Sequence, residues 1–458
     1  MRDSYDVLVI GGGQAGIPLA HALAAAGKSV ALAERKWLGG SCINFGCTPT
    51  KAVITSARIA HLARRAADYG ISVAGVEVDF AAVLTRARDI SESMRGHLRQ
   101  GFEGRANPAL IEGHARFLGK DGGQFRLAVG EREVRAAQVV LDTGTRSAIP
   151  PIEGLADIDH IDSENWLEHR ELPARLAIVG GGYIGLEMAQ FYRRMGSEVV
   201  VIERGEQIAG HEDRDVAAAL GRILGGEGIE FRLKSSASRF RRSAAGVTVA
   251  IEHEGAEETL EMSHVFVALG REPNTDQLGL ETIGLEVDAH GIVPTDARLA
   301  SAVSGVWAAG DIRGGPMFTH SAWDDYRILA SQLAGDGSRT CARIVPYAMF
   351  TDPELGRVGI GEDEARRQGR RIRVGRFDIA DNGKARERGE TAGFIKVIAD
   401  ADDDRLLGAA VLAPEGAELV HLYVTLMNAG APYTVLERAI QIHPTLAEAA
   451  QSAVAAIE

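Results

Sequence analysis

A glycine-rich turn between a short apolar strand and a helix occurs twice in the chain. The first copy, GGGQAG at residues 11–16, follows the apolar run 6–10 and precedes an alanine-rich helical stretch. The second copy, GGGYIG, occupies residues 180–185. Because a second apolar run follows each helix, both copies lie within β-α-β units, the context typical of dinucleotide binding. The sequence therefore predicts an α/β chain with two Rossmann-like units.

Each glycine of the first turn has a physical task. Gly11, Gly13 and Gly16 allow a tight turn, a close approach of the backbone to a pyrophosphate, and packing of the helix on the strand. The helix N-terminus supplies N–H donors and a positive dipole to the anion. Glu34 ends the next strand, where its carboxylate can accept hydrogen bonds from an adenosine ribose. This unit is predicted to bind one dinucleotide.

The second turn repeats the spacing. Gly180, Gly182 and Gly185 stand at the same intervals, and Glu203 ends the following strand. Two such turns indicate either two dinucleotides or one dinucleotide and one degenerate site. Glu203 would bind a free ribose 2'-hydroxyl and repel a 2'-phosphate, which favours NADH over NADPH. The adjacent Arg204 weakens this preference, since a guanidinium pairs well with phosphate.

Cysteines supply a further signal. Cys42 and Cys47 lie five positions apart in GGSCINFGCTPTK, and Cys341 is the third cysteine of the chain. These are too few for a disulfide framework, and a structural zinc site would need a second pair. At a helix start the two neighbours could close a disulfide, and the helix N-terminus would lower a thiol pKa. Two buried free cysteines are the alternative, and Cys341 is expected to be structural.

Composition excludes several classes of protein. The net charge of −13 is opposite in sign to the basic footprint of a nucleic-acid binder. No apolar run approaches the roughly 20 residues of a membrane span. The apolar stretch 7–27 could pass for a signal peptide, but Asp3, Asp6 and the consecutive glycines argue against it. The negative charge and the short apolar runs predict that the protein binds neither nucleic acid nor membrane. The small number of cysteines predicts a cytoplasmic protein.

Taken together, these motifs resemble the flavin-dependent pyridine nucleotide-disulfide oxidoreductases, which include glutathione reductase, dihydrolipoamide dehydrogenase and mercuric reductase. The similarity covers nearly the whole length and is greatest to mercuric reductase-like and hypothiocyanous acid reductase-like flavoproteins, partly through FTHSAWDDYRIL at 318–329. The resemblance implies a glutathione reductase-like fold. Residues 1–150 and 271–340 would bind FAD, residues 151–270 would bind NAD(P)H, and residues 341–458 would form an α+β dimerisation domain.

The resemblance also implies the roles of individual residues. FAD would occupy the first turn, and NADH or NADPH the second. Cys47 would be the flavin-proximal thiol and Cys42 the thiol that meets substrate, the two forming a redox-active disulfide. Lys51 would lie beside flavin N5, with Glu187 as its ion-pair partner. Further cofactor contacts are implied at Ala115, Thr143, Gly144, Gly270 and Asp311.

The C-terminal sequence HPTLAE resembles the acid–base pair of this family. His443 and Glu448 would reach the dithiol of the other subunit, which implies a homodimer with shared active sites. A histidine oriented by a carboxylate can accept the proton of Cys42 and later protonate a leaving thiolate. Without the resemblance, a histidine before a helix that starts at Pro444 is more typical of a cap or surface residue.

We expect a small disulfide or oxidant as substrate. Hg(II) reduction is the alternative, although the chain lacks the C-terminal cysteine pair common in mercuric reductases and retains the histidine and glutamate that they lack. A diaphorase or oxidase that bypasses the dithiol and a flavin-bound sensor with negligible turnover are further alternatives. No metal site is expected.

The segment 318–329 leaves roles open. Asp324, Asp325 and Tyr326 could line the mouth of the substrate site, or they could form the solvated start of a helix, where acidic residues are favoured. His320 could approach the dithiol.

Overall fold

The fold begins with a sheet of the order β3-β2-β1-β6-β5-β4, in which β17 pairs with β6. The computed structural model describes residues 3–244 and 246–458. Strands β1, β2, β3, β6 and β17 run parallel, whereas β4 and β5 extend the sheet as an antiparallel ribbon. The strands are β1 (Ser4–Ile10), β2 (Val30–Glu34), β3 (Ala109–Glu112), β4 (Ala115–Asp121), β5 (Gln124–Val129), β6 (Arg132–Leu141) and β17 (Val306–Ala308).

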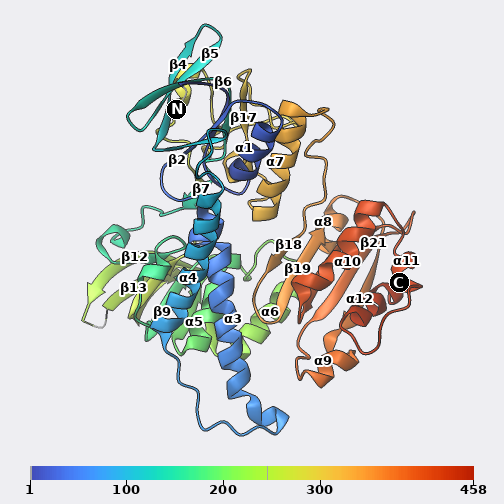
Figure 1. Ribbon diagram of the computed structural model, residues 1–458. Helices are drawn as coiled ribbons and strands as arrows, with labels where there is room; N and C mark the ends of the chain where they lie inside the picture. The colour runs from blue at the N-terminus through green and yellow to red at the C-terminus, as the bar shows by residue number, and fades with distance from the viewer. Residues whose placement is uncertain (1–2, 245) are drawn as a thin grey trace.

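Two helices cover one face of this sheet. Helix α1 (Gly16–Ala25) and helix α7 (Thr319–Ala334) lie side by side, although some 300 residues separate them in sequence (Figure 1). Apolar side chains of both helices and of β1 form one buried cluster. From β1 the chain first adds β2 and β3 on one side of the sheet and later returns to place β6 on the other side of β1. The carboxyl ends of β1 and β6 therefore open the crevice in which parallel sheets bind ligands.

A second sheet repeats this plan with the order β11-β10-β9-β15-β8, and its strands are all parallel. Its helices are α5 (Tyr183–Met195) and α6 (Arg214–Gly226). The strands are β8 (Ile161–Asp162), β9 (Arg175–Val179), β10 (Glu198–Ile202), β11 (Ile229–Arg232) and β15 (His264–Val267). Smaller antiparallel pairings accompany it: β12 (Ser235–Ser243), β13 (Gly246–His253) and β14 (Ala256–Met262), and β7 (Thr145–Ser147) with β16 (Arg271–Pro273).

Long helices join the two units. Helix α2 (Gly40–Asn44) leads into α3 (Cys47–Arg64), which packs against α4 (Phe80–Gln100) and α5 (Figure 1). Asp79 caps α4 by accepting a hydrogen bond from the Ala82 N–H at 2.9 Å. The helix that carries Cys47 is thereby packed on α5 of the second unit, while its N-terminus points to the first unit.

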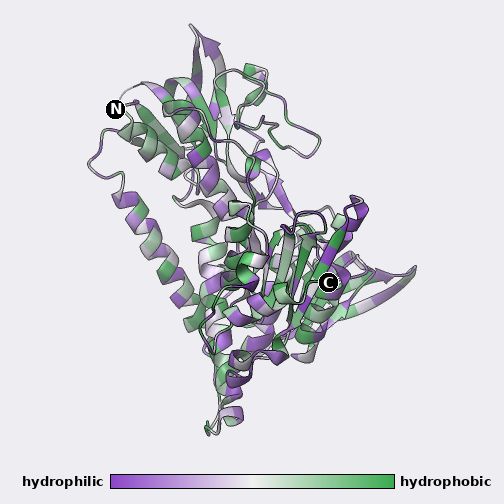
Figure 2. Ribbon diagram, turned by 90° about the vertical axis from the view of Figure 1, so that its right-hand side faces the viewer, coloured by the Kyte–Doolittle hydropathy of each residue, from purple (hydrophilic) through white to green (hydrophobic). Residues whose placement is uncertain are grey.

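The C-terminal unit is an antiparallel sheet of the order β18-β19-β22-β21-β20. In Figure 2, hydrophobic residues gather in its strands and hydrophilic ones at its rim. The elements are β18 (Tyr347–Met349), β19 (Glu354–Gly359), β20 (Ile372–Asp378), β21 (Phe394–Asp400), β22 (Leu406–Ala413), α8 (Glu362–Arg367), α9 (Gly383–Glu387), α10 (Gly416–Ala429), α11 (Thr434–Glu437) and α12 (Ala447–Ala455).

The predicted start of the last helix at Pro444 is wrong, because α12 begins at Ala447 with Leu446 as its N-cap. The Glu448 side chain turns back and accepts a hydrogen bond from the Thr445 N–H at 2.8 Å. This bond holds residues 443–446 in a bend that precedes the helix.

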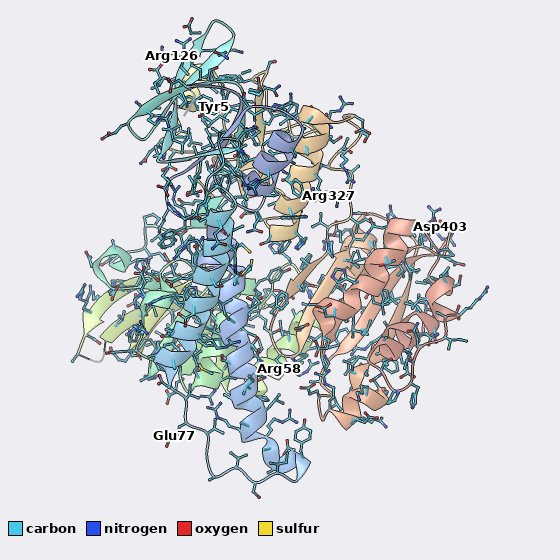
Figure 3. All side chains as sticks on the ribbon, viewed as in Figure 1. Tyr5, Arg58, Glu77, Arg126, Arg327 and Asp403 are labelled. Atoms are coloured by element: carbon cyan, nitrogen blue, oxygen red, sulfur yellow. The ribbon has the colours of Figure 1, made fainter. Side chains whose placement is uncertain are left out.

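Partly buried ion pairs tie the C-terminal unit to the rest of the chain. Arg58, which Figure 3 labels on α3, pairs with Asp352 at 2.6 Å and also with Glu390. Arg194 on α5 pairs with Asp352 and with Glu227, each at 2.7 Å. None of the helices in the described part of the chain has the length and apolar character that crossing a bilayer requires.

Candidate active site

One large cavity of about 1630 Å³ lies between the first sheet, the second sheet and the C-terminal unit. Both glycine-rich turns and both cysteines of the 39–51 loop line it. The predicted site residues in its wall are Gly11, Gly13, Glu34, Cys42, Cys47, Lys51, Ala115, Thr143, Gly144, Gly182, Glu187, Gly270 and Asp311. The others lie outside the wall: Gly16, Gly180, Gly185, Glu203, Arg204, His443 and Glu448.

The first glycine-rich turn is too tight for side chains. A Cβ at Gly11, whose φ is +107°, would lie 2.1 Å from the Asp142 carbonyl oxygen. A Cβ at Gly16 would lie 2.1 Å from the Gly11 carbonyl oxygen. Gly13 faces the Asp142 carboxylate, with a Cβ-to-Oδ2 distance of 2.7 Å. Gly11 and Gly16 thus bring helix α1 onto β1, so that its N-terminus points into the cavity.

In the second turn, two glycines allow close packing of the backbone, and a third leaves room for a ligand. A Cβ at Gly180 would lie 2.3 Å from the Ala268 carbonyl oxygen, and one at Gly185 would lie 2.1 Å from the Gly180 carbonyl oxygen. At Gly182, by contrast, no described atom comes within 4 Å of an added Cβ. Because Gly182 lines the cavity, its bare backbone offers a ligand a close approach.

The strand-end glutamates are held in the same way in both units. Glu34 accepts hydrogen bonds from the Gly12 and Lys36 N–H groups, each at 2.7 Å. Glu203 accepts from the Gly181 and Gly205 N–H groups, also at 2.7 Å. Each carboxylate therefore fixes its own turn, and its remaining lone pairs can meet a ribose. Arg204 is exposed to solvent.

Two further carboxylates stand at the first turn. Asp142 accepts a hydrogen bond from the Gly16 N–H at 2.7 Å, and burial raises its pKa well above the usual range. Asp311 accepts from the Thr145 hydroxyl at 3.0 Å, and burial raises its pKa as well. Sequence reasoning missed Asp142, although it directly precedes the predicted Thr143 and Gly144.

The cysteine pair stands where two helices meet. Cys42 belongs to α2, and Cys47 is the first residue of α3. Both are free thiols, and Cys47 is the more exposed of the two, toward the cavity. A hydrogen bond from Cys42, with further help from Lys51 and Thr319, lowers the pKa of Cys47 to about 6, although desolvation by the surrounding protein opposes this shift. The same pairing raises the pKa of Cys42. When one of the two thiols ionises, the negative charge is therefore expected on Cys47 and not on Cys42.

Lys51 follows Cys47 by one helical turn. Its Nζ lies 3.1 and 2.8 Å from the two carboxylate oxygens of Glu187 on α5, so the structure joins the predicted pair across 136 residues. Burial alone would lower the pKa of Lys51, but the Glu187 and Cys47 charges raise it above its usual value. The Phe350 N–H donates to Glu187 at 2.8 Å and fixes the carboxylate.

The segment 318–329 reaches the dithiol through a residue that the sequence did not single out. The Thr319 hydroxyl lies 3.1 Å from the Cys47 sulfur. His320 lines the cavity, but its Nε2 lies 2.6 Å from the Pro346 carbonyl oxygen, and burial lowers its pKa.

Asp325 fits neither of its predicted roles, because it is fully buried and holds both Arg313 and Arg343. Asp324 does line the cavity, where it pairs with Arg343 at 2.6 Å.

The C-terminal histidine and glutamate are bonded to each other but do not meet the dithiol within this chain. His443 Nδ1 lies 2.9 Å from Glu448 Oε1, and the histidine side chain is 77% exposed. Neither residue lines the cavity. Ile440 and Ile442 beside them are 100% and 80% exposed, which is unusual for large apolar side chains.

This arrangement fits two dinucleotides and one dithiol. The first turn has the tight backbone, helix N-terminus and strand-end acid that a pyrophosphate and its ribose require, and the second turn leaves open space at Gly182. No group of three or more potential metal ligands occurs among the described residues. Two electron-carrying cofactors could thus approach a thiolate-forming cysteine pair through one cavity.

Comparisons with known proteins agree with this chemistry. Residues 5–325 match the model of the family "Pyridine nucleotide-disulphide oxidoreductase", and residues 345–454 match that of its dimerisation domain. The probable pyridine nucleotide-disulfide oxidoreductase RclA of Escherichia coli K12 is 33% identical over 97% of this chain and 98% of its own length. A dihydrolipoyl dehydrogenase of Halobacterium salinarum is 35% identical over 98% of this chain and 95% of its own.

A solved structure, the HOCl-induced flavoprotein disulfide reductase RclA from Escherichia coli, superimposes with a TM-score of 0.89. It is 32% identical, and the match covers 98% of this chain and 99% of that one. The predicted fold class, with its glutathione reductase-like plan, and the prediction of a redox enzyme are confirmed. The family uses FAD and a nicotinamide dinucleotide. The chain belongs to the pyridine nucleotide-disulfide oxidoreductase family.

Proposed function

We propose that the protein is an NADH-dependent flavoprotein that reduces a small disulfide or oxidant through Cys42 and Cys47. The observation that carries this proposal is the position of both cysteines in the wall of the cavity that both glycine-rich turns share, where the proximity of Cys42 lowers the pKa of Cys47 to about 6. FAD would occupy the first turn, within residues 1–150 and 271–340. NADH would occupy the second, within residues 151–270.

The chain's own residues would carry out the thiol chemistry. When bound, FAD supplies the two-electron transfer between NADH and the Cys42–Cys47 disulfide. The Cys42 thiolate then attacks a substrate disulfide and expels one thiolate, leaving a mixed disulfide. Cys47 attacks the Cys42 sulfur, re-forms the internal bond and expels the second thiolate. The balance is NADH, one proton and one disulfide converted to NAD⁺ and two thiols.

His443 would move the protons in these steps. It would take the proton of Cys42 and return it to the leaving thiolate, with Glu448 holding the ring at 2.9 Å. Because the pair lies outside the cavity of its own chain, we propose that it serves the dithiol of a second copy. The exposed Ile440 and Ile442 support an interface there, and the match of residues 345–454 to a dimerisation domain supports a homodimer.

The choice of NADH rests on Glu203. Its carboxylate is fixed by two backbone N–H groups at 2.7 Å, so it cannot turn away from a 2'-phosphate without breaking both bonds. The names of the relatives support the reaction class: one is a flavoprotein disulfide reductase, and others are dihydrolipoyl dehydrogenases.

A substrate panel tests this proposal. Purified holoenzyme is assayed for NADH and, separately, NADPH oxidation with lipoamide, glutathione disulfide, hypothiocyanite and Hg(II). We expect turnover with one of the first three, a preference for NADH and loss of activity in Cys42→Ser. Activity that survives Cys42→Ser would identify a diaphorase or oxidase instead. Oxidation of NADH with Hg(II) alone would identify a mercuric reductase, and the absence of turnover with every oxidant a sensor.

Subunit sharing needs its own test. Cys42→Ser and His443→Gln are each expected to be inactive as homodimers. If the active site is shared, a mixed dimer has one site with both functional groups intact. Mixing and reassociating the two variants should therefore restore up to about a quarter of wild-type activity, the statistical value when half of the dimers are mixed and each has one working site. No recovery in reassociated mixtures would contradict the shared site.

A further inference from the structure

The segment 318–329 holds a threonine against the reactive cysteine. The Thr319 hydroxyl oxygen lies 3.1 Å from the Cys47 sulfur, although 272 residues separate them in sequence. A thiolate has no proton to donate, so the hydroxyl must be the donor once Cys47 is ionised. Hydrogen bonds to an ionised acceptor are stronger than neutral ones. The contact therefore favours the charged form of this sulfur.

The hydroxyl is directed to the cysteine instead of to its own helix. Threonine near a helix start commonly caps the helix by accepting a backbone N–H. Here Thr319 is the first residue inside α7, the N-cap is Phe318, and no side chain caps the helix. The helix thus begins without the usual cap, and the threonine side chain is free to meet Cys47.

Two sets of contacts fix the position of this helix start. The Phe318 ring stacks between His320 and Tyr347, with ring centroids 5.4 Å from each. Nearly two turns further on, Asp325 accepts hydrogen bonds from the Gly310 N–H at 2.8 Å and from two arginines, and is fully buried. The N-terminal half of α7 is therefore held at two points, one just before Thr319 and one after it. A clamped donor loses little entropy when it bonds the thiolate.

The charge of Lys51, beside Cys47, is not sufficient by itself to stabilise the Cys47 thiolate. Lys51 gives two hydrogen bonds to Glu187, at 2.8 and 3.1 Å, so its charge is largely compensated. The Glu187 carboxylate itself acts to raise the pKa of Cys47, against the lysine. A neutral donor without a counter-charge adds stabilisation that the ion pair does not supply.

We propose that Thr319 is a catalytic residue whose hydroxyl donates a hydrogen bond to the Cys47 thiolate and keeps that sulfur ionised in the reduced enzyme. The inference builds on the proposed dithiol function, and it assigns a task to the motif at 318–329. It requires that the hydroxyl, and not merely the bulk of the side chain, sets the ionisation of Cys47.

The test compares Thr319→Val, which keeps the shape, with Thr319→Ser, which keeps the hydroxyl. The reduced holoenzyme is alkylated with iodoacetamide between pH 4 and 10, and labelling of Cys47 is resolved by peptide mass spectrometry. The long-wavelength absorbance of a thiolate beside flavin is titrated in parallel. Thr248→Val is the matched control, because it removes a threonine hydrogen bond to Glu261 in a different sheet.

We expect a midpoint near pH 6 for the wild type and for Thr248→Val. Loss of one hydrogen bond to a charged group should raise it by about one to two pH units in Thr319→Val. Thr319→Ser should restore a midpoint within about half a unit of wild type. Thr319→Ala serves in place of the valine variant if the latter does not fold.

An unchanged midpoint in Thr319→Val or Thr319→Ala overturns the inference, and so does an equal rise in Thr319→Ser. Failure of the proposed function looks different. In that case the wild-type protein takes up no FAD and gives no long-wavelength band, while alkylation still reports the effect of Thr319 on Cys47.

Discussion

Alanine at Gly182 and at Gly185 should separate cofactor binding from stability within a single turn. At Gly182 the backbone is extended, with φ −81° and ψ −175°, and no described atom lies within 4 Å of an added Cβ. The methyl group therefore meets only the cavity. At Gly185 the Cβ would lie 2.1 Å from the Gly180 carbonyl oxygen, a distance that no rotamer can relieve. The same substitution thus meets open space in one place and backbone in the other.

The expected magnitudes follow from these contacts. Gly182→Ala should leave the free energy of unfolding within about 0.5 kcal/mol of wild type, because it strains nothing. It should raise the KM for NADH at least about tenfold, a loss of about 1.4 kcal/mol, because its methyl group takes the space of the approaching pyrophosphate. Gly185→Ala should lower the free energy of unfolding by about 1–3 kcal/mol through overpacking between α5 and β9.

Urea denaturation followed by circular dichroism measures the stability of both variants, and steady-state kinetics with varied NADH measures the binding effect. FAD content, read from the visible spectrum, checks that the first turn is undisturbed. Wild-type NADH affinity in Gly182→Ala would refute the reasoning, because the pyrophosphate would then not approach this backbone. Equal destabilisation of the two variants would refute the division of tasks between the glycines.

Other predictions concern the thiols, the nicotinamide site and the interior. Cys47→Ser should abolish the long-wavelength band of the reduced enzyme and Cys42→Ser should retain it, as stopped-flow spectra can show; a band that persists without Cys47 would reverse the assignment. Because the pKa of Cys47 is lowered to about 6, the thiolate should be fully present well above pH 6 and lost as the pH falls through that value, whereas a spectral midpoint near pH 9 would contradict this sign. Glu203→Ala should lower the ratio of kcat/KM for NADH to that for NADPH at least about tenfold, since the repulsion of the 2'-phosphate disappears; an unchanged ratio would place the discrimination elsewhere. Arg194→Met should cost up to about 3 kcal/mol of unfolding free energy in urea, because it removes the arginine partner of Glu227 while Asp352 keeps Arg58, and a loss below about 1 kcal/mol would show that the network is not needed.

Local sequence patterns were enough to predict the two β-α-β units. The apolar runs, the glycine spacing and the strand-end acids are each local, and the structure has β1, α1 and β2, and again β9, α5 and β10, at those places. The pairing of Lys51 with Glu187 was predicted through the family resemblance, since nothing local in either helix points to the other. The structure brings them to 2.8 Å.

Contacts between distant segments could not be derived in this way. Thr319 meets Cys47 because β17 returns to the first sheet beside β6 and places the start of α7 over the cysteine loop. Asp325 looks like a solvated acid near a helix start. It is buried because Arg313 and Arg343 approach from two other segments. In both cases the chemistry of the side chain is set by a neighbour more than ten residues away.

The strand-end glutamates show how a sequence motif can carry two functions in one residue. The sequence alone predicts that Glu34 and Glu203 accept hydrogen bonds from ribose hydroxyls. In the structure each already accepts two hydrogen bonds, from the second glycine of its turn and from the N–H two residues beyond itself. Each acid therefore fixes the backbone of its own turn, and under the proposed function a ribose would meet a carboxylate whose orientation is already set. Since a fixed charge cannot move aside, we propose that the same rigidity at Glu203 disfavours a 2'-phosphate at the second turn.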